Sequence, residues 1–286
     1  MATFLNTIKL IHIHPILIFF IVLSFITGTF IHLFILLSIV FIHELGHFLA
    51  AKYYKWRIQS IVLWVFGGVM KTDESANRPI KEDVIVTVLG PIQHLFIYFF
   101  LLLMMYGNVL PDTIIETAIQ FNWMILLFNL LPIYPLDGGK LLLYGLSSYL
   151  PFRRAHRMTI LFSMYAAILI ILLQIFVLPF TLSALLIILF LLLENKTEWK
   201  NHYYVFIRFL LNRFNRPVNL QIEKITIPST YKLIDAFSLF RRNRTNEVHI
   251  NDPKKVYFLN EQESLYLYFK QNKINETIGE IIKKEN

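Results

Sequence analysis

Residues 30–51 of this 286-residue chain read FIHLFILLSIVFIHELGHFLAA, and the stretch is largely apolar. A helix needs roughly 20 apolar residues to cross the hydrocarbon core of a bilayer, and this stretch has that length. It also contains the pattern His43-Glu44-Leu45-Gly46-His47. One carboxyl and two imidazole side chains are costly inside such a segment unless a partner compensates them. The stretch therefore predicts a membrane helix that carries a polar site.

The composition agrees with a membrane protein. Hydrophobic residues make up 56% of the chain and charged residues only 16%, whereas soluble domains have about 45–50% and about 25%. The excess apolar surface is expected to face lipid. The chain contains no cysteine, which excludes a disulfide framework and a thiol protease. The first apolar run lacks a small-residue cleavage site, so we expect no cleavable signal peptide.

Five further stretches approach spanning length, namely residues 10–26, 84–106, 113–131, 159–176 and 178–193. Together with residues 30–51 they predict an all-α polytopic membrane protein with about six transmembrane helices. Residues 1–193 then form the membrane domain. Lys and Arg cluster in the connections at 52–81 and 140–157, while the other connections between these stretches have none. The positive-inside rule therefore places both termini in the cytoplasm.

The net charge of +8 is explained by this topology, and a nucleic-acid patch is the weaker interpretation, so we expect no direct nucleic-acid partner.

The composition changes sharply after residue 193. Residues 194–220 are charged and aromatic, which predicts an amphipathic linker along the membrane surface. Residues 221–286 have the pattern of a small cytoplasmic α/β domain, with Asp252-Pro253 as a turn and Asn260 as a helix N-cap. We expect strands at 222–227, 247–251 and 255–259 and helices at 231–241 and 261–270. A unit this small favours pairing with a second copy.

The His43–His47 pattern predicts a zinc site. Two histidines four residues apart on a helix project from the same face, and two neutral imidazoles at that spacing bind zinc while a neighbouring carboxylate takes a proton from water. Zinc activates water that is otherwise too weak a nucleophile for an amide. Coincidence is the competing interpretation, and the cost of burying these groups in a membrane argues against it.

A catalytic zinc ion usually has three protein ligands, so a third is expected from another span. Asp137 is the strongest candidate, because prolines interrupt the apolar segment before it, and irregular backbone at that depth lines a buried or wet site. A simple helix cap is the alternative role for Asp137. His94, His12 and His14 are weaker candidates, and His94 is better explained by a hydrogen bond between helices.

The connection 57–74 is unusually apolar for a loop. Two β-favouring runs flank Gly67-Gly68, which predicts a β-hairpin that dips into the membrane with the glycines as its turn. Its edge is a candidate for binding an extended substrate as an added strand. A hairpin that merely packs on the helices is the alternative.

The combined motifs resemble those of the site-2 protease family of intramembrane zinc metalloproteases, peptidase family M50. That family carries HExxH in one span and N-x-x-P-x-x-x-x-D-G in a later one, and both patterns are present, at 43–47 and 129–138. The resemblance covers about residues 30–140 and includes Gly90-Pro91. It implies a regulated intramembrane protease in which His43, His47 and Asp137 bind one zinc ion and Glu44 is the catalytic base. It also implies that Asn129 and Pro135 contact the substrate or the oxyanion.

The sporulation members of that family have the closer likeness. It implies that residues 221–286 are a CBS-like regulatory domain, with ATP as its ligand and a route to homo-oligomers, although a phosphate-binding glycine loop is absent from this tail. The substrate would be a membrane-associated pro-protein, a sporulation sigma-factor precursor, and membrane proteins would act as inhibitors. The location would be the mother-cell membrane around the forespore.

The sequence is also compatible with two functions other than proteolysis. Intramembrane histidines and acids also line the path of a metal transporter or form a zinc-dependent sensor, and a catalytically silent scaffold would keep the fold alone. Neither needs a general base, so Glu44 discriminates between them and a protease. The tail has a structural alternative too, as a dimerisation or docking surface.

Overall fold

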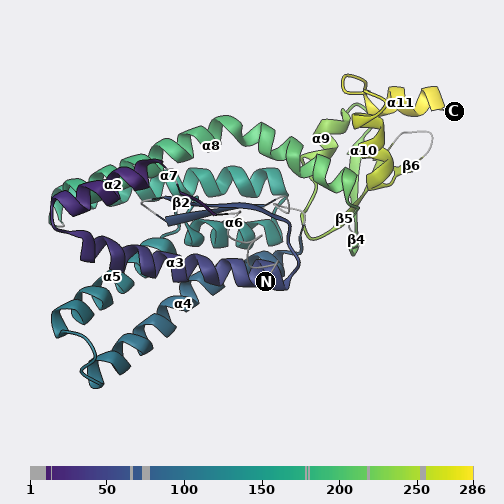
Figure 1. The fold of residues 1–286 in the computed structure, drawn as a ribbon. Coiled ribbons are helices and arrows are strands. Elements are labelled where there is room, and N and C mark those ends of the chain that lie inside the picture. Colours follow the sequence, from purple (N-terminus) through teal and green to yellow (C-terminus); the bar gives the residue numbers. More distant parts are fainter. Residues whose placement is uncertain are drawn as a thin grey trace. The chain divides into compact units, whose positions relative to one another are not determined.

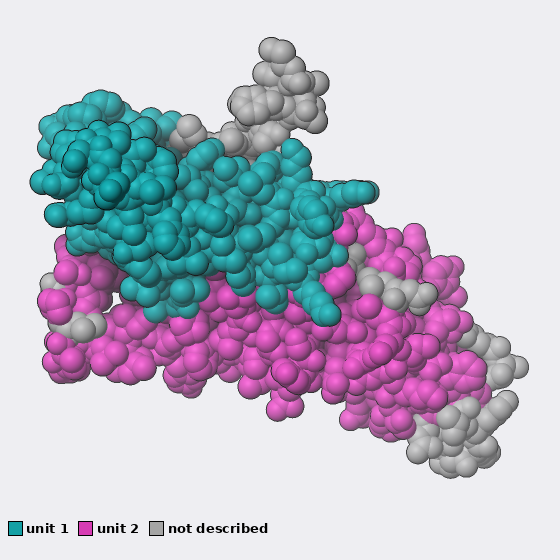
Figure 2. All heavy atoms as spheres, turned by 90° about the horizontal axis from the view of Figure 1, so that it is seen from below, with its two compact units in different colours: residues 1–75, 81–131 teal, residues 76–80, 132–286 magenta. Residues whose placement is uncertain are grey.

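The computed structural model describes residues 11–13, 15–64, 67–72, 78–177, 179, 181–217, 220–251 and 256–285. Helices make up most of these ranges, together with two three-stranded sheets (Figure 1). The chain divides into two compact units, residues 1–75 with 81–131 and residues 76–80 with 132–286 (Figure 2).

The first unit carries the helices that follow one another around the His43–His47 pattern. In chain order its elements are β1 (Ile11–Ile13), α2 (Pro15–Ile26), α3 (Phe30–Tyr53), β2 (Ile58–Trp64), β3 (Gly67–Thr72), α4 (Ile80–Tyr106) and α5 (Asp112–Leu130). One apolar core joins α3, α4 and α5, and its buried members are Ile39, Ile97, Leu101, Ile115 and Ala118.

Four helices in the described residues are long and apolar enough to cross a membrane, namely α3, α4, α5 and α7 (Phe152–Phe176). Much of their apolar surface points outward: Phe99 and Leu103 of α4 are 62% and 70% exposed. So many exposed large apolar side chains are rare on a soluble monomer. We therefore expect this surface to face lipid. The structure therefore confirms a mostly helical membrane protein.

The first predicted span is built differently. Residues 11–13 form a strand and α2 has only 12 residues, which gives a length of about 18 Å against a hydrocarbon core of about 30 Å. Pro15 opens α2, where its missing N–H costs nothing. His12 belongs to β1 and pairs in register with Val62, while His14 lies outside the described residues.

The predicted hairpin is present as β2 and β3, which pair antiparallel from Ile58 with Thr72 to Trp64 with Gly67. Its predicted turn is wrong, because Gly67 and Gly68 belong to β3. β1 pairs parallel with the other side of β2, so β2 is the central strand of the order β1-β2-β3. In the described part of the sheet, an added strand would have to pair with β1 or β3.

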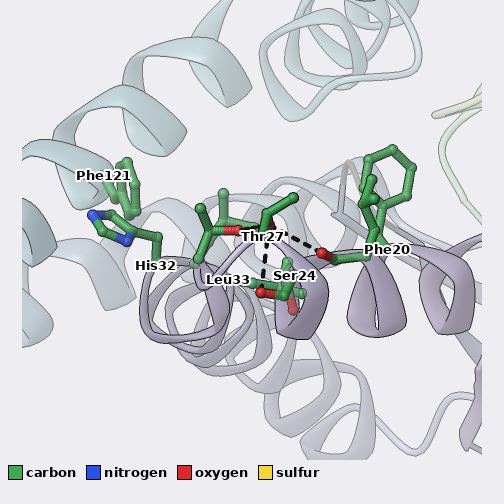
Figure 3. A pocket seen from close by; sticks show the side chains of 9 residues that line it. Phe20, Ser24, Thr27, His32, Leu33 and Phe121 are labelled. Carbon is green, nitrogen blue, oxygen red and sulfur yellow. Dashed lines mark hydrogen bonds between the residues drawn. The ribbon is translucent and has the colours of Figure 1, made fainter.

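A short connection between α2 and α3 turns the chain sharply at Gly28, whose φ of 72° is a left-handed conformation that glycine adopts without strain. The Thr27 hydroxyl donates to the carbonyl of Leu23 at 3.0 Å and lies 2.8 Å from the Thr29 hydroxyl. Figure 3 shows the mostly apolar hollow beside this turn, between Phe20, His32 and Phe121. The hydroxyl bonds satisfy polar groups of the turn within the chain itself.

The second unit combines helices with a small sheet. Its elements are α6 (Asp137–Tyr149), α7, α8 (Leu182–Asn215), β4 (Ile222–Pro228), α9 (Leu233–Phe237), β5 (Thr245–Asn251), β6 (Val256–Leu259), α10 (Glu261–Phe269) and α11 (Ile278–Glu285). α8 runs without a break through the expected boundary at 193/194, so the linker is the second half of a helix. Residues 194–215 contain no glycine or proline, and the helix ends just before Pro217.

The C-terminal strands follow the predicted positions. β4 pairs parallel with β5, and β5 pairs antiparallel with β6. Asn260 is confirmed as the N-cap of α10: it accepts from the N–H of Glu263 at 2.7 Å, and Glu263 accepts from the N–H of Asn260. The first predicted helix is shorter than expected, α11 was not predicted, and Asp252-Pro253 lies outside the described residues.

The C-terminal sheet shares its hydrophobic core with α7 and α8. Phe206, Phe209 and Leu210 of α8 belong to the same buried cluster as Ile227 and Val248, and the rings of Phe152 and Phe209 stack at 4.4 Å. A fragment that begins at residue 221 would therefore lack part of its own core.

A buried ion pair links α8 to α10. The Arg213 guanidinium on α8 donates to both carboxylate oxygens of Glu261 and, at 3.1 Å, to the carbonyl of Arg242. Asn246 adds two donors to the same carboxylate. Removing either charged partner would leave an uncompensated buried charge, which is strongly destabilising.

Candidate metal centre

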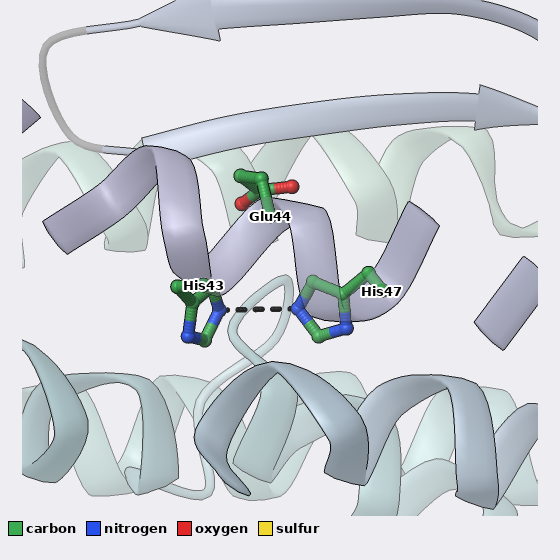
Figure 4. Close-up of side chains that lie close together, drawn as sticks. All are labelled: His43, Glu44 and His47. Carbon is green, nitrogen blue, oxygen red and sulfur yellow. Dashed lines mark hydrogen bonds between the residues drawn. The ribbon is translucent and has the colours of Figure 1, made fainter. Parts of the chain in front are cut away.

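His43, Glu44 and His47 meet on one stretch of α3. One potential ligand atom from each lies within 4.8 Å of the others. Figure 4 shows the two imidazoles facing each other on one side of the helix. The Glu44 side chain points away from the opposite side in this view. The Nε2 atoms of the two rings are 3.1 Å apart. Both histidines are buried, and Glu44 is half-buried.

His47 is held from α4. Its Nδ1 lies 2.8 Å from the backbone carbonyl oxygen of Val86. A carbonyl oxygen only accepts hydrogen bonds, so Nδ1 carries the proton and donates. The neutral ring then has its lone pair on Nε2, the atom that faces His43.

Two glycines permit this close contact between α3 and α4. A Cβ atom at Gly90 would lie 2.2 Å from Cε1 of His47, and one at Gly46 would lie 2.4 Å from the carbonyl oxygen of Leu89. Any side chain at these positions would push the helices apart or turn the imidazole. In the sequence, Gly90 stands out only as part of a Gly-Pro pair. Its steric role follows from the packing of α4 against His47.

His43 is held by a second histidine. Its Nδ1 lies 3.0 Å from Nε2 of His94 on α4, and Nδ1 of His94 lies 2.7 Å from Oδ1 of Asn122 on α5. The Asn122 amide also donates to the backbone carbonyl of His94 at 3.0 Å. His94 is thus hydrogen-bonded between helices, as the sequence analysis favoured, and it contacts a histidine of the candidate site.

Asp137 lies in the second unit as the first residue of α6, and it is buried. Its carboxylate accepts from the Lys140 ammonium at 3.1 Å. The N-cap of α6 is Leu136, with no side-chain capping bond. In its alternative role, Asp137 would cap a helix that begins at Gly138. The structure differs, because Asp137 is itself the first residue of the helix. The partial positive charge at a helix start favours a carboxylate there.

The segment that precedes Asp137 is fixed by two other helices. The N–H of Tyr134 donates to Ser163 of α7 at 2.9 Å, and the Asn195 amide of α8 donates to the Tyr134 carbonyl at 2.5 Å. A Cβ atom at Gly139 would lie 2.3 Å from the Tyr134 nitrogen, so only glycine lets α6 fold back against this segment. The backbone around Asp137 is therefore rigid.

Asn129 belongs to the first unit and Pro135 to the second. Asn129 is in the last turn of α5, half-buried, and its amide donates to the carbonyl of Ile125 at 3.1 Å. Pro135 is exposed in the second unit.

Sequence reasoning missed Asn122 and the Val86 carbonyl. A signal for Asn122 existed, because an asparagine inside an apolar span predicts a hydrogen bond to another helix. The Val86 carbonyl had no signal, since every residue carries a backbone carbonyl.

Comparison with known proteins gives a consistent result. The model of peptidase family M50 matches residues 31–117. The chain is 35% identical over 286 residues to stage IV sporulation protein FB of Bacillus subtilis, which covers 99% of both chains. It is also 35% identical over 114 residues to a zinc metalloprotease of Methanocaldococcus jannaschii, a match that covers 38% of this chain and 33% of that protein.

A solved structure supports the same assignment. The site-2 protease from Methanocaldococcus jannaschii superposes with a TM-score of 0.51 at 26% identity, over 66% of this chain and 89% of that one. Similarity to a family of metalloproteases does not favour the alternative functions of a metal transporter or a zinc-dependent sensor. The chain belongs to peptidase family M50, and it is an intramembrane zinc metalloprotease of the site-2 protease type.

Proposed function

We propose that His43, His47 and Asp137 hold one zinc ion in this protease and that Glu44 is the general base. The observation that carries the proposal is the pair of buried imidazoles on α3, whose Nε2 atoms face each other at 3.1 Å. Two zinc–nitrogen bonds of about 2.0–2.1 Å each can reach across that gap. Nitrogen and carboxylate oxygen are also the donors that zinc prefers.

Asp137 is the proposed third ligand for three reasons. Its carboxylate is buried at the start of α6, the segment before it is fixed by α7 and α8, and its position matches the aspartate of the family motif. A rigid backbone matters because a ligand must be held within about 0.5 Å of its productive position.

In this proposal each residue has a separate role in peptide hydrolysis. A zinc ion held by these residues would act as a Lewis acid that activates water and polarises the scissile carbonyl. Glu44 accepts a proton from water as the carbon–oxygen bond forms, and it delivers a proton to the amide nitrogen as the carbon–nitrogen bond breaks. The Asn129 amide is a suitable donor to the substrate or the oxyanion, and Pro135 is proposed beside the substrate by family resemblance.

Substituting alanine for Gly90 tests the packing of the site. The added Cβ atom would overlap the His47 ring, so we expect the ring to turn and zinc affinity to fall by about 10–100-fold, as for other losses of ligand positioning. The measurement is the zinc dissociation constant of the purified protein by chelator competition. Gly145→Ala is the matched control, because a Cβ atom there meets nothing within 4 Å. Equal affinity in both variants would contradict the packing argument.

The substrate proposed is a membrane-associated pro-protein of the sporulation sigma-factor class. The relative that matches over 99% of both chains bears the name of a sporulation protein. The extended substrate would add to an edge of the β1-β2-β3 sheet, which means β3 or β1, since β2 is flanked on both sides.

Co-expression in a non-sporulating host tests this substrate class. A sigma-factor precursor with a C-terminal tag should yield a shorter tagged product beside the wild type and no such product beside the Glu44→Gln variant, which excludes host proteases. A single-span membrane protein without a pro-segment is the control and should stay intact. An uncut precursor beside zinc-loaded wild type would contradict the substrate assignment.

The proposal also covers the topology and the tail. Six spans would include the N-terminal run at 10–26, which contains β1 and α2, and the apolar first part of α8. The whole of α8 has 34 residues and extends about 51 Å, well beyond the hydrocarbon core. Both termini would be cytoplasmic, in the mother-cell membrane around the forespore, with membrane proteins as inhibitors.

The domain organisation proposed is a membrane domain at 1–193, an amphipathic linker at 194–220 and a CBS-like regulatory domain at 221–286. Family resemblance supports the CBS-like domain, ATP as its ligand and oligomerisation through it. The parallel β4–β5 pair beside an antiparallel β6 agrees with a small α/β domain.

A further inference from the structure

A backbone carbonyl determines the orientation of the Asn122 side chain. Its Nδ2 donates to the carbonyl oxygen of His94 at 3.0 Å. Because a carbonyl oxygen cannot donate, the amide nitrogen must face it. The other end of the amide, Oδ1, therefore faces Nδ1 of His94 at 2.7 Å.

That orientation determines the tautomers of both histidines. Oδ1 of Asn122 only accepts, so Nδ1 of His94 carries a proton. An imidazolium without any exposed surface is costly inside an apolar span, which leaves the neutral ring with its lone pair on Nε2. Nδ1 of His43 then donates to that Nε2 at 3.0 Å, and the lone pair of His43 lies on its own Nε2, the atom that faces His47.

The chain of bonds also restricts the orientation of the His43 ring. His94 and Asn122 are 0% and 1% exposed, and they come from α4 and α5. Close packing holds buried side chains in defined rotamer minima. The hydrogen bond from His43 to a fixed acceptor therefore restricts rotation of its ring about the side-chain bonds.

We propose that His94 and Asn122 are positioning residues for zinc, which act through His43 and set its tautomer and ring orientation. The proposal rests on the proposed role of His43 as a ligand. Metal-ligating histidines commonly donate their second ring N–H to a carboxylate, a carbonyl or water, and loss of such a partner weakens metal binding about 10–100-fold. Here the acceptor is an imidazole, itself oriented by an asparagine.

The test compares two variants of His94 in the full chain, purified in detergent. His94→Gln places an amide oxygen near the position of Nε2 and keeps an acceptor for His43, whereas His94→Leu keeps volume and removes the acceptor. We expect His94→Leu to weaken zinc binding about 10–100-fold and His94→Gln to recover most of it. The readouts are the zinc dissociation constant by chelator competition and the absorption spectrum of the cobalt-substituted protein.

Asn122→Leu covers the case in which His94→Leu folds poorly, and where both variants fold, a double-mutant cycle compares them. Asn122→Leu alone should weaken zinc binding in the same direction, and the double variant should be no worse than His94→Leu, because Asn122 acts only through His94. Independent packing effects would instead add. His32→Leu is the matched control, since His32 is an exposed histidine on α3 whose ring meets that of Phe121 edge to face, and this variant should bind zinc as the wild type does.

Two results would overturn the positioning role while leaving the metal site intact. One is wild-type zinc affinity in His94→Leu, and the other is equal weakening in His94→Gln and His94→Leu, which would indicate packing alone. Zinc binding that survives His43→Ala would overturn the proposed ligand set as well, so the two failures are distinguishable.

Discussion

Replacing Glu44 with glutamine should strongly reduce proteolysis while zinc stays bound. Glutamine keeps the size of the side chain but cannot accept the proton that leaves water, so the rate of peptide hydrolysis should fall by about 10²–10⁴-fold. His43 and His47 are unchanged, so zinc content should equal that of the wild type. The measurements are single-turnover cleavage of a tagged pro-protein and the zinc content of the same preparation.

Glu116→Gln provides the matched control for this experiment. Glu116 lies exposed on α5 in the same unit, so the same chemical change is made away from the site, and activity should be that of the wild type. Cleavage at the wild-type rate by a zinc-loaded Glu44→Gln protein would show that another group is the base.

Replacing Asp137 with asparagine removes the proposed third ligand. Asparagine has nearly the same volume and is tolerated at a helix start, so α6 should still form, but a negatively charged oxygen donor is lost. We expect zinc affinity to fall by more than the roughly 10–100-fold that follows loss of an outer partner, and cleavage to be lost with it. Chelator competition and a cleavage assay on the same protein measure both effects.

Asp112→Asn separates a ligand from a residue that merely begins a helix. Asp112 is also the first residue of its helix, α5, again after an N-cap that makes no side-chain bond, and it is exposed. Its loss removes only an interaction with the helix dipole, worth about 0.3–1 kcal/mol. If Asp137→Asn binds zinc like Asp112→Asn, Asp137 is a helix-start residue and the third ligand lies elsewhere.

Features that depend on neighbours in sequence were predicted well. His43, Glu44 and His47 are brought together by the helix itself, since residues four apart lie on one face. Asn260 and Glu263 form a capping box because three residues separate them at a helix start. Four of the six predicted spans are membrane-capable helices in the described residues, for the same reason, since each apolar stretch carries its signal within one element.

Features that depend on contacts between distant residues were predicted poorly. β1 pairs with residues 61–63 of β2, about fifty positions away, and a three-residue strand leaves no periodic pattern. Gly67 and Gly68 were expected in a turn, yet glycine is also tolerated in a strand, and pairing with β2 decided the outcome. α8 passed the expected boundary because backbone hydrogen bonding continues through polar residues that favour helix.

The sequence by itself determined a membrane-embedded His-Glu-His group on residues 30–51, because apolar length and helical periodicity are local properties. Only the tertiary structure decided how that group is held. His94 and the Val86 carbonyl contact the two imidazoles from α4, Asn122 holds His94 from α5, and Gly90 lets α4 approach His47. Hydrogen bonds act over about 3 Å, so which polar groups are partners depends on how helices pack and not on their order along the chain.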